Sequence, residues 1–305
     1  MTLALCLVVV VVPYVTGDAY YQSVAIQIFI YIALAVSYQL LFGYARLVSF
    51  GHAAFFGVSA YTSAVLIAKV GMPHPLAWVV GILAAALIAL VAGRIVIRLE
   101  PLLLAVATLA FSQIVVLVVS SLPDVTGGQN GLVTTPLTLG DIPVSDFTYW
   151  FVAAGMLLVV VVCVALVASP LGRLLLAVGD DPVGARSLGT NTTRVLVFTF
   201  VVSSALAGVA GAMLTQATAV LAPETIGLDT SILILAMIAV GGLRSMPGAV
   251  IGAVVLSLIP VFFASLQQGA ILLYGAIILV VFVISPDGLT ALPRVLAQRF
   301  RRRSR

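Results

Sequence analysis

The sequence predicts an all-α polytopic membrane protein with about ten transmembrane helices. The 305 residues are 63% hydrophobic and only 8% charged, whereas soluble domains are about half apolar and a quarter charged. The apolar residues gather in runs of roughly 15–23 residues that lack the alternation of barrel strands. Arginines recur in every second gap between these runs. Because backbone groups in lipid must be hydrogen-bonded internally, we expect each run to be a helix.

The candidate spans follow one another along the whole chain, so we treat residues 1–305 as a single transmembrane domain. The first run lacks the basic start and the cleavage site of a signal peptide, and we interpret it as a short first span. The eighth run is too short to cross alone unless the bilayer thins locally or its Gly241–Gly242 end is buried in protein. The ten runs cover residues 1–15, 24–42, 48–68, 76–93, 101–120, 148–168, 195–217, 230–243, 248–265 and 270–285.

The charged residues test this count independently. If both termini are cytoplasmic, every arginine falls on the cytoplasmic side, as the positive-inside rule predicts. The opposite loops carry acidic residues and one cation, Lys69. A basic tail, residues 286–305, ends the chain, and we expect it to lie near anionic membrane lipid. The arginines before that tail are Arg46, Arg94, Arg98, Arg173, Arg186, Arg194 and Arg244.

Two loops are long. The extracytoplasmic loop, residues 121–147, contains the Gly-rich stretch TGGQNGL (Thr126 to Leu132). The cytoplasmic loop, residues 169–194, contains a candidate short helix over residues 182–188. Asp181 is suited to cap that helix, Pro182 to its first position, and Gly189 to the left-handed residue after its end. Such a short helix is marginal alone, so we expect it to pack on its own membrane domain or on a partner.

Chemistry-bearing residues are scarce within the predicted spans. None of the ten acidic residues falls inside one, although proton-driven transporters usually carry buried ionisable relays. Only His52 is a candidate. The sequence has no phosphate-binding loop, HExxH motif, metal-ligand cluster or nucleophile elbow, and it predicts no catalytic residue, no metal ligand and no bound cofactor. Cys6 and Cys163 lie in apolar runs, which argues against a disulfide framework. These observations favour a transport pathway that a separate partner energises, or a passive channel.

Six segments along the chain carry distinctive motifs: GYARLVSFGHAAFFGVSAYTSAVL (Gly43 to Leu66), LLLAVATLAFSQI (Leu102 to Ile114), TGGQNGL, SPLGRLLLAVGDDPVGARSLGTNTTR (Ser169 to Arg194), AVGGLRSMPGAVIGA (Ala239 to Ala253) and SPDGL (Ser285 to Leu289). Each resembles a segment of one family, the branched-chain amino acid ABC transporter permeases, and together they cover nearly the whole chain in the family's order. The segment LLLAVATLAFSQI resembles the M-type rather than the H-type subunit. The family patterns read GYxGxxSxGHAAFFGxGAY for the first and VLGGLGSxxGAxxGA for the fifth.

The resemblance implies a vitamin-B12-importer-like (type II) permease fold in a bacterial plasma membrane. It implies four kinds of partner: a homologous H-type permease, two ABC ATPase subunits that bind ATP and Mg²⁺, an extracytoplasmic substrate-binding protein, and membrane lipid. No nucleic acid is expected. The solute would be a branched-chain amino acid or a similar small polar solute, such as urea, a short amide or a small organic acid. Glu100-Pro101-Leu102-Leu103 departs from the family's start of span five, which leaves the solute open, and Arg244 replaces a glycine.

The candidate site residues form two groups, one expected to line the substrate pathway and one expected to couple the chain to the ATPase. Each pathway residue could instead have a purely structural role: His52 could fix the turn into span three, Thr108 and Ser112 could form hydrogen bonds between neighbouring helices, and TGGQN could be a solvated turn. The resemblance places a coupling helix that docks on the ATPase between Asp180 and Gly189, and Ala185 is our candidate for its docking face because a small side chain permits close approach. The pathway group is His52, Thr108, Ser112, Gln113, Thr126, Gly127, Gly128, Gln129 and Asn130; the coupling group is Asp180, Asp181, Pro182, Ala185, Arg186, Leu188 and Gly189.

Two other classes of function remain open. A stand-alone secondary transporter or channel for a small solute is the leading alternative, and it would be marked by an intramembrane carboxylate, which the predicted spans lack. A membrane enzyme ranks third, because the sequence shows no catalytic constellation. Gly43, Gly51, Gly57, Gly208 and Gly211 are expected to be close-packing positions rather than ligand contacts.

Overall fold

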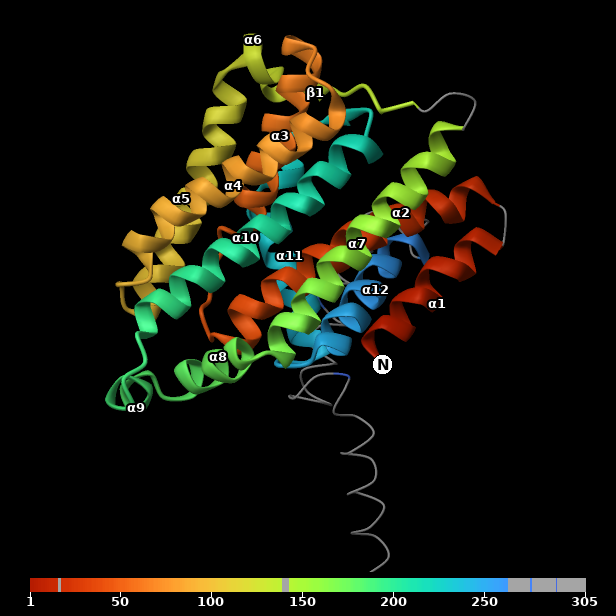
Figure 1. Ribbon diagram of the computed structural model, residues 1–305. Coiled ribbons are helices and arrows are strands. Elements are labelled where there is room, and N and C mark those ends of the chain that lie inside the picture. The colour runs from red at the N-terminus through yellow and green to blue at the C-terminus, as the bar shows by residue number, and fades with distance from the viewer. Residues whose placement is uncertain (16–17, 139–142, 263–274, 276–288, 290–305) are drawn as a thin grey trace, which may run out of the picture.

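A computed structural model describes residues 1–15, 18–138, 143–262, 275 and 289, and shows a helical bundle (Figure 1). Six of its helices are long and apolar enough to cross a membrane. They are α2 with its π-helical continuation η1 (Ala19–Gln39 and Leu40–Tyr44), α3 (His52–Val70), α4 (His74–Val96), α5 (Pro101–Ser121), α7 (Val144–Ala168) and α10 (Thr192–Ala217). Three shorter apolar helices are α1 (Thr2–Val15), α11 (Leu228–Gly241) and α12 (Met246–Phe262).

Nine of the ten predicted spans coincide with these helices, and the tenth, residues 270–285, lies almost wholly outside the described residues. The chain is therefore an all-α polytopic membrane protein, as predicted. The basic tail also lies outside the described residues, apart from residue 289. The short eighth span is α11. Its Gly241 end is buried where α11 turns back into α12, and the backbone carbonyl of Gly242 accepts a 3.2 Å hydrogen bond from the Gln39 amide.

Local sequence explains where the helices begin and end. Asp18 caps α2 by accepting a hydrogen bond from the Tyr20 amide, and Asn191 caps α10 by accepting one from the Arg194 amide. Pro101 opens α5, where its missing N–H costs nothing. Gly71 ends α3 with a φ of 69°, a left-handed conformation that suits glycine.

The centre of the bundle is built from α2, α3 and α10, with α4 packed against α3 and α10, and small residues let these elements approach closely. A Cβ added to Gly211 would lie 2.3 Å from the Phe56 carbonyl oxygen, and one added to Gly57 would lie 2.7 Å from the Ile226 side chain. Ser59 donates a 2.7 Å hydrogen bond to the Gly208 carbonyl across the same interface. The close-packing interpretation of these glycines is confirmed.

The bundle has two different ends (Figure 1). The β1 end holds α6 (Pro123–Thr126), η2 (Gly128–Asn130), η3 (Pro223–Ile226) and a small antiparallel sheet, in which β1 (Leu132–Val133) pairs with β2 (Val220–Leu221). The α9 end holds α8 (Pro170–Asp180) and α9 (Pro182–Ser187). Arg46 and Arg244 lie at the same end, because both pair with Asp180 at the end of α8. Arg194 also lies there, in the first turn of α10 that follows α9.

Candidate functional site

His52 lies at the start of α3, enclosed by the bundle. Its Nε2 is 2.9 Å from Ser37 Oγ, its ring stacks on Tyr38 with centroids 4.8 Å apart, and its side chain is 1% exposed. The Tyr38 hydroxyl in turn accepts a 3.0 Å hydrogen bond from the Ser49 amide. These contacts tie the loop before α3 to α2, so the geometry favours the turn-fixing interpretation of His52 over a pathway role.

The three polar residues predicted on span five occupy different environments along α5. Thr108 is buried, and its hydroxyl accepts a 3.1 Å hydrogen bond from the Phe50 amide and donates one to the Ala105 carbonyl. Ser112 is fully buried, and its hydroxyl has no hydrogen-bond partner among the described residues. Gln113 is exposed, on the least buried of the six long helices. Thr108 therefore anchors a loop, whereas Gln113 is available to a partner or a solute.

The stretch TGGQNGL folds into a tight turn at the β1 end. The Thr126 hydroxyl donates a 2.7 Å hydrogen bond to the Leu122 carbonyl and accepts one from the Gly128 amide. Gly127 and Gly128 have φ values of 78° and 59°. A Cβ on Gly127 would lie 2.0 Å from the Gly131 carbonyl oxygen.

The next residues join this turn to the chain segment after α10. Leu132 pairs with Leu221, and the Thr134 amide donates a 2.9 Å hydrogen bond to the Ala219 carbonyl. Gln129 and Asn130 are exposed. The loop is therefore a rigid cap that presents two amide side chains.

The predicted short helix is present as α9, one residue shorter than expected. Asp181 Oδ1 accepts hydrogen bonds of 3.0 and 2.9 Å from the Val183 and Gly184 amides. Pro182 occupies the first turn, and Gly189 has a φ of 82°. The capping residues thus act as the sequence predicts.

The outward face of α9 differs from the expected one. Ala185 is only 6% exposed because it packs inward, so the expectation that it forms the docking face does not fit this structure. The large apolar side chains exposed on α9 and at the residue after it are Val183, at 72%, and Leu188, at 87%. Sequence reasoning missed Val183. The sequence did contain a signal for Val183: it is an apolar residue close to the capping Asp181, in a helix too short to bury all of its apolar side chains.

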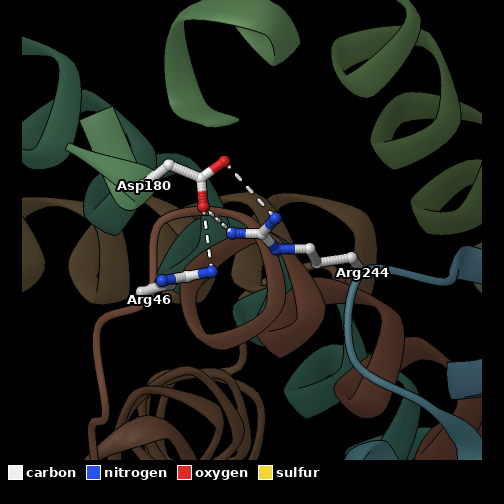
Figure 2. A network of polar contacts seen from close by, with 3 residues as sticks. All are labelled: Arg46, Asp180 and Arg244. Atoms are coloured by element: carbon white, nitrogen blue, oxygen red, sulfur yellow. Dashed lines mark hydrogen bonds and ion pairs between the residues drawn. The ribbon is translucent and has the colours of Figure 1, made fainter. Parts of the chain in front are cut away.

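Asp180, the last residue of α8, binds two arginines of the same chain (Figure 2). Its Oδ1 lies 2.9 Å from Arg46 and also pairs with Arg244, which makes a second contact of 3.4 Å to Oδ2. We call these three residues the Asp180 cluster. The hydrogen bond from Arg244, together with the charges of both arginines, lowers the pKa of Asp180 below its ordinary value. Arg186, another member of the coupling group, donates a 3.1 Å hydrogen bond to the Thr192 hydroxyl.

Both arginines of the Asp180 cluster have left-handed backbones. The φ values are 55° for Arg46 and 62° for Arg244, a region that side chains other than glycine rarely adopt. Glycine stands at both positions in the family patterns that this chain resembles. The chain therefore has an arginine at each of two turns, and both side chains reach the same carboxylate from opposite parts of the sequence.

A cavity of about 350 Å³, lined by both apolar and polar side chains, lies toward the β1 end between α2, α3, α10 and α11. We call it the α2 cavity. No residue of the predicted pathway group lines it. The sequence signal was a run of polar side chains four residues apart on one face of α2: Ser23, Gln27 and Tyr31. The polar lining is completed by Thr218, Thr225 and Thr230. Among the described residues, no group of three His, Cys, Asp or Glu side chains could hold a metal ion.

The six spanning helices and the two capped ends define a multi-pass membrane protein. The chain belongs to the branched-chain amino acid transport system permease component family, whose profile matches residues 20–286. Proteins of this family are transport subunits rather than enzymes, so this chain is a permease subunit of an importer.

The chain is similar to both types of permease protein in this family. It is 28% identical to the high-affinity branched-chain amino acid transport system permease protein LivM of Salmonella typhimurium, over 89% of this chain and 70% of the relative. It is 26% identical to LivM of Escherichia coli, with the same coverage. It is 27% identical to LivH of Salmonella typhimurium, over 87% of this chain and 92% of the relative. No solved structure gives a significant match.

Proposed function

We propose that this chain is the M-type permease of an ABC importer and forms half of the translocation pathway with an H-type homologue. Two ATPase subunits bind at the α9 end, which faces the cytoplasm, and a substrate-binding protein docks at the β1 end. The complete permease has the ten-helix fold of type II importers. The observation that carries this proposal is α9, a capped helix that exposes Val183 and Leu188 to the surroundings.

The connections of α9 account for coupling. It lies between α8 and α10, and α10 packs along α2, α3 and α4. A displacement of α9 by closing ATPase subunits therefore acts on the central helix of the bundle. The second helix that α9 can move is α8, whose end is bound to the turns at Arg46 and Arg244 through the Asp180 cluster.

The proposed solute is a branched-chain amino acid or a similarly small polar molecule. Support comes from the relatives' names and from the α2 cavity, whose lining combines hydroxyl and amide groups with apolar side chains and contains no charged side chain. A stand-alone secondary transporter is disfavoured because the described spans carry no carboxylate in their interiors.

The docking experiment uses the full importer with its ATPase co-expressed. The double variant Val183→Asp/Leu188→Asp adds charge to the exposed face of α9, and we expect loss of ATPase co-purification and of transport. The control for ATPase co-purification is Val133→Asp, which alters a 65% exposed valine at the β1 end and should leave the ATPase bound. If the double variant keeps full ATPase binding and solute-stimulated ATP hydrolysis, α9 is not the docking helix.

Topology is tested separately by thiol labelling of intact cells. Cys6 and Cys163 are both buried, so the native background should be low. Cysteine at Gln129 should react with an impermeant reagent, and cysteine at Leu188 should react only after the cells are opened. Labelling of the Leu188→Cys protein in intact cells would invert the proposed orientation.

A further inference from the structure

A second hollow, of about 750 Å³, lies at the α9 end between the last turns of α4 and the first turns of α10. It is larger than the α2 cavity and falls within the size range of ligand sites. We call it the α4–α10 groove. Its lining includes three arginines and a set of apolar side chains, and it contains no acidic residue.

The lining is divided by depth. Arg94 lies in the last turn of α4, Arg98 just beyond it, and Arg194 in the first turns of α10. The apolar residues lie further along both spans. At 1.5 Å per residue, Leu90 is about 6 Å deeper than Arg94, and Val201 is about 10 Å deeper than Arg194. The groove thus passes from a cationic mouth at the membrane surface to an apolar floor within the span.

The three arginines of the mouth have no anionic partner in the described part of the chain. Asp180 is occupied by Arg46 and Arg244, and these are the ion pairs that the described residues form. All three side chains of the mouth are exposed. Like charges gathered around a hollow repel one another, so an external anion that binds among them would be stabilised.

We propose that the α4–α10 groove binds an anionic phospholipid of the cytoplasmic leaflet. The phosphate lies among Arg94, Arg98 and Arg194, and an acyl chain lies along Leu90, Phe198 and Val201. Phe198 is 48% exposed on a helix long and apolar enough to span the membrane, so an acyl chain can reach it at that depth. Basic pockets between spans on the cytoplasmic side suit acidic headgroups. An acidic surface of the ATPase would match the mouth but would leave the apolar floor uncovered.

The position of the groove links lipid to coupling. Asn191 and Thr193, between α9 and the arginine of α10, also line it. A bound headgroup would therefore contact the segment through which α9 reaches α10. This role is independent of which solute the importer carries.

The test measures lipid retained by the full chain, purified in mild detergent and then supplied with defined phospholipid. The probe is phosphatidylglycerol, compared with phosphatidylcholine of the same acyl chains, and bound lipid is counted by native mass spectrometry. The triple variant Arg94→Gln/Arg98→Gln/Arg194→Gln removes the charges of the mouth. Since each arginine near an anionic surface contributes about a fivefold gain, we expect roughly a 100-fold loss of phosphatidylglycerol affinity.

Two further variants distinguish binding in the groove from attraction of lipid by the protein's overall positive charge. Arg173→Gln removes an exposed arginine of α8 outside the groove, and it should retain phosphatidylglycerol as the wild type does. Val201→Trp keeps all three arginines and fills the apolar floor, and it should weaken binding at least tenfold.

Three outcomes would overturn the proposal. The first is equal loss of lipid in Arg173→Gln and in the triple variant, which would show only non-specific attraction. The second is equal retention of phosphatidylcholine and phosphatidylglycerol by the wild type. The third is an unchanged lipid count in the triple variant with loss of ATPase co-purification, which would assign the mouth to the ATPase.

Discussion

The two ends of the bundle are held by different forces. At the β1 end, the turn at Thr126 to Leu132 is fixed by uncharged hydrogen bonds, left-handed glycines and the β1–β2 pair. At the α9 end, the Asp180 cluster joins three segments through charged side chains that are between 33% and 56% exposed. Exposed ion pairs contribute little stability and are weakened by salt. The β1 end is therefore built as a fixed platform, and the α9 end as a junction that can be released and formed again.

Gly127→Ala should have the largest effect, because it attacks the fixed end. The new Cβ would lie 2.0 Å from the Gly131 carbonyl oxygen, in a backbone with a φ of 78°. The backbone conformation alone costs roughly 1–3 kcal/mol, and the overlap adds to it. We expect a large fall in the thermal unfolding temperature of the purified chain.

Gly189→Ala is the matched control at the α9 end. Its φ of 82° is similar, but nothing lies within 4 Å of the added Cβ. It should therefore show only the backbone cost, and a smaller fall in unfolding temperature than Gly127→Ala. Equal effects of the two substitutions would mean that the β1 end is not more tightly packed.

Asp180→Asn should have the next largest effect, which falls mainly on coupling and only slightly on the stability of the fold. It leaves Arg46 and Arg244 side by side without their carboxylate, so the three joined segments should separate. We expect reduced solute-stimulated ATP hydrolysis, with unchanged affinity for the binding protein. Raising the salt concentration should bring the wild type toward the variant, because screening removes the same attraction. A variant with full stimulation at low salt would show that the cluster has no part in coupling.

The pH dependence of the Asp180 cluster follows from the lowered pKa of Asp180. Because the pKa is lower in the folded state than the ordinary value of 3.8, the cluster stabilises the fold above that value. Its contribution is lost only as the pH falls through the lowered value. The difference in unfolding temperature between the wild type and Asp180→Asn should stay constant from pH 8 to about pH 5 and shrink below about pH 4. A difference that already disappears near pH 6 would contradict this assignment.

The sequence predicts the parts of this structure that depend on local chemistry. Long apolar runs between arginine-bearing loops give the spans, and Asp181, Pro182 and Gly189 give α9 its limits, because capping acts within a few residues. Contacts between distant segments are not encoded in this way. The inward packing of Ala185 and the pairing of Asp180 with Arg244 depend on how α8 lies against the turns after α2 and α11.

The same distinction applies to the pathway residues. The sequence indicated hydroxyls on span five, but it could not tell that Thr108 bonds the loop at Phe50 while Gln113 faces outward. The polar face of α2 was not predicted from the sequence, because Ser23 and Gln27 are common residues whose role depends on the helices that pack opposite them. The pathway roles of the span-five residues stay predictions, because they depend on where the second permease lies.

The smallest expected effect separates backbone strain from charge within the Asp180 cluster. Arg244→Gly and Arg244→Ala both remove one of the two arginines, and Arg46 remains on Asp180 in each variant. They differ in the backbone, because alanine keeps the cost of a φ of 62° and glycine does not. That cost is about 1–2 kcal/mol per residue in the left-handed region, and the greater freedom of glycine in the unfolded chain offsets part of it. We therefore expect Arg244→Gly to unfold at a slightly higher temperature than Arg244→Ala, with equal loss of coupling in both. If the Arg244→Ala protein unfolds at the higher temperature, the ion pair of Arg244 holds residue 244 in the left-handed conformation, and the backbone relaxes when that pair is removed.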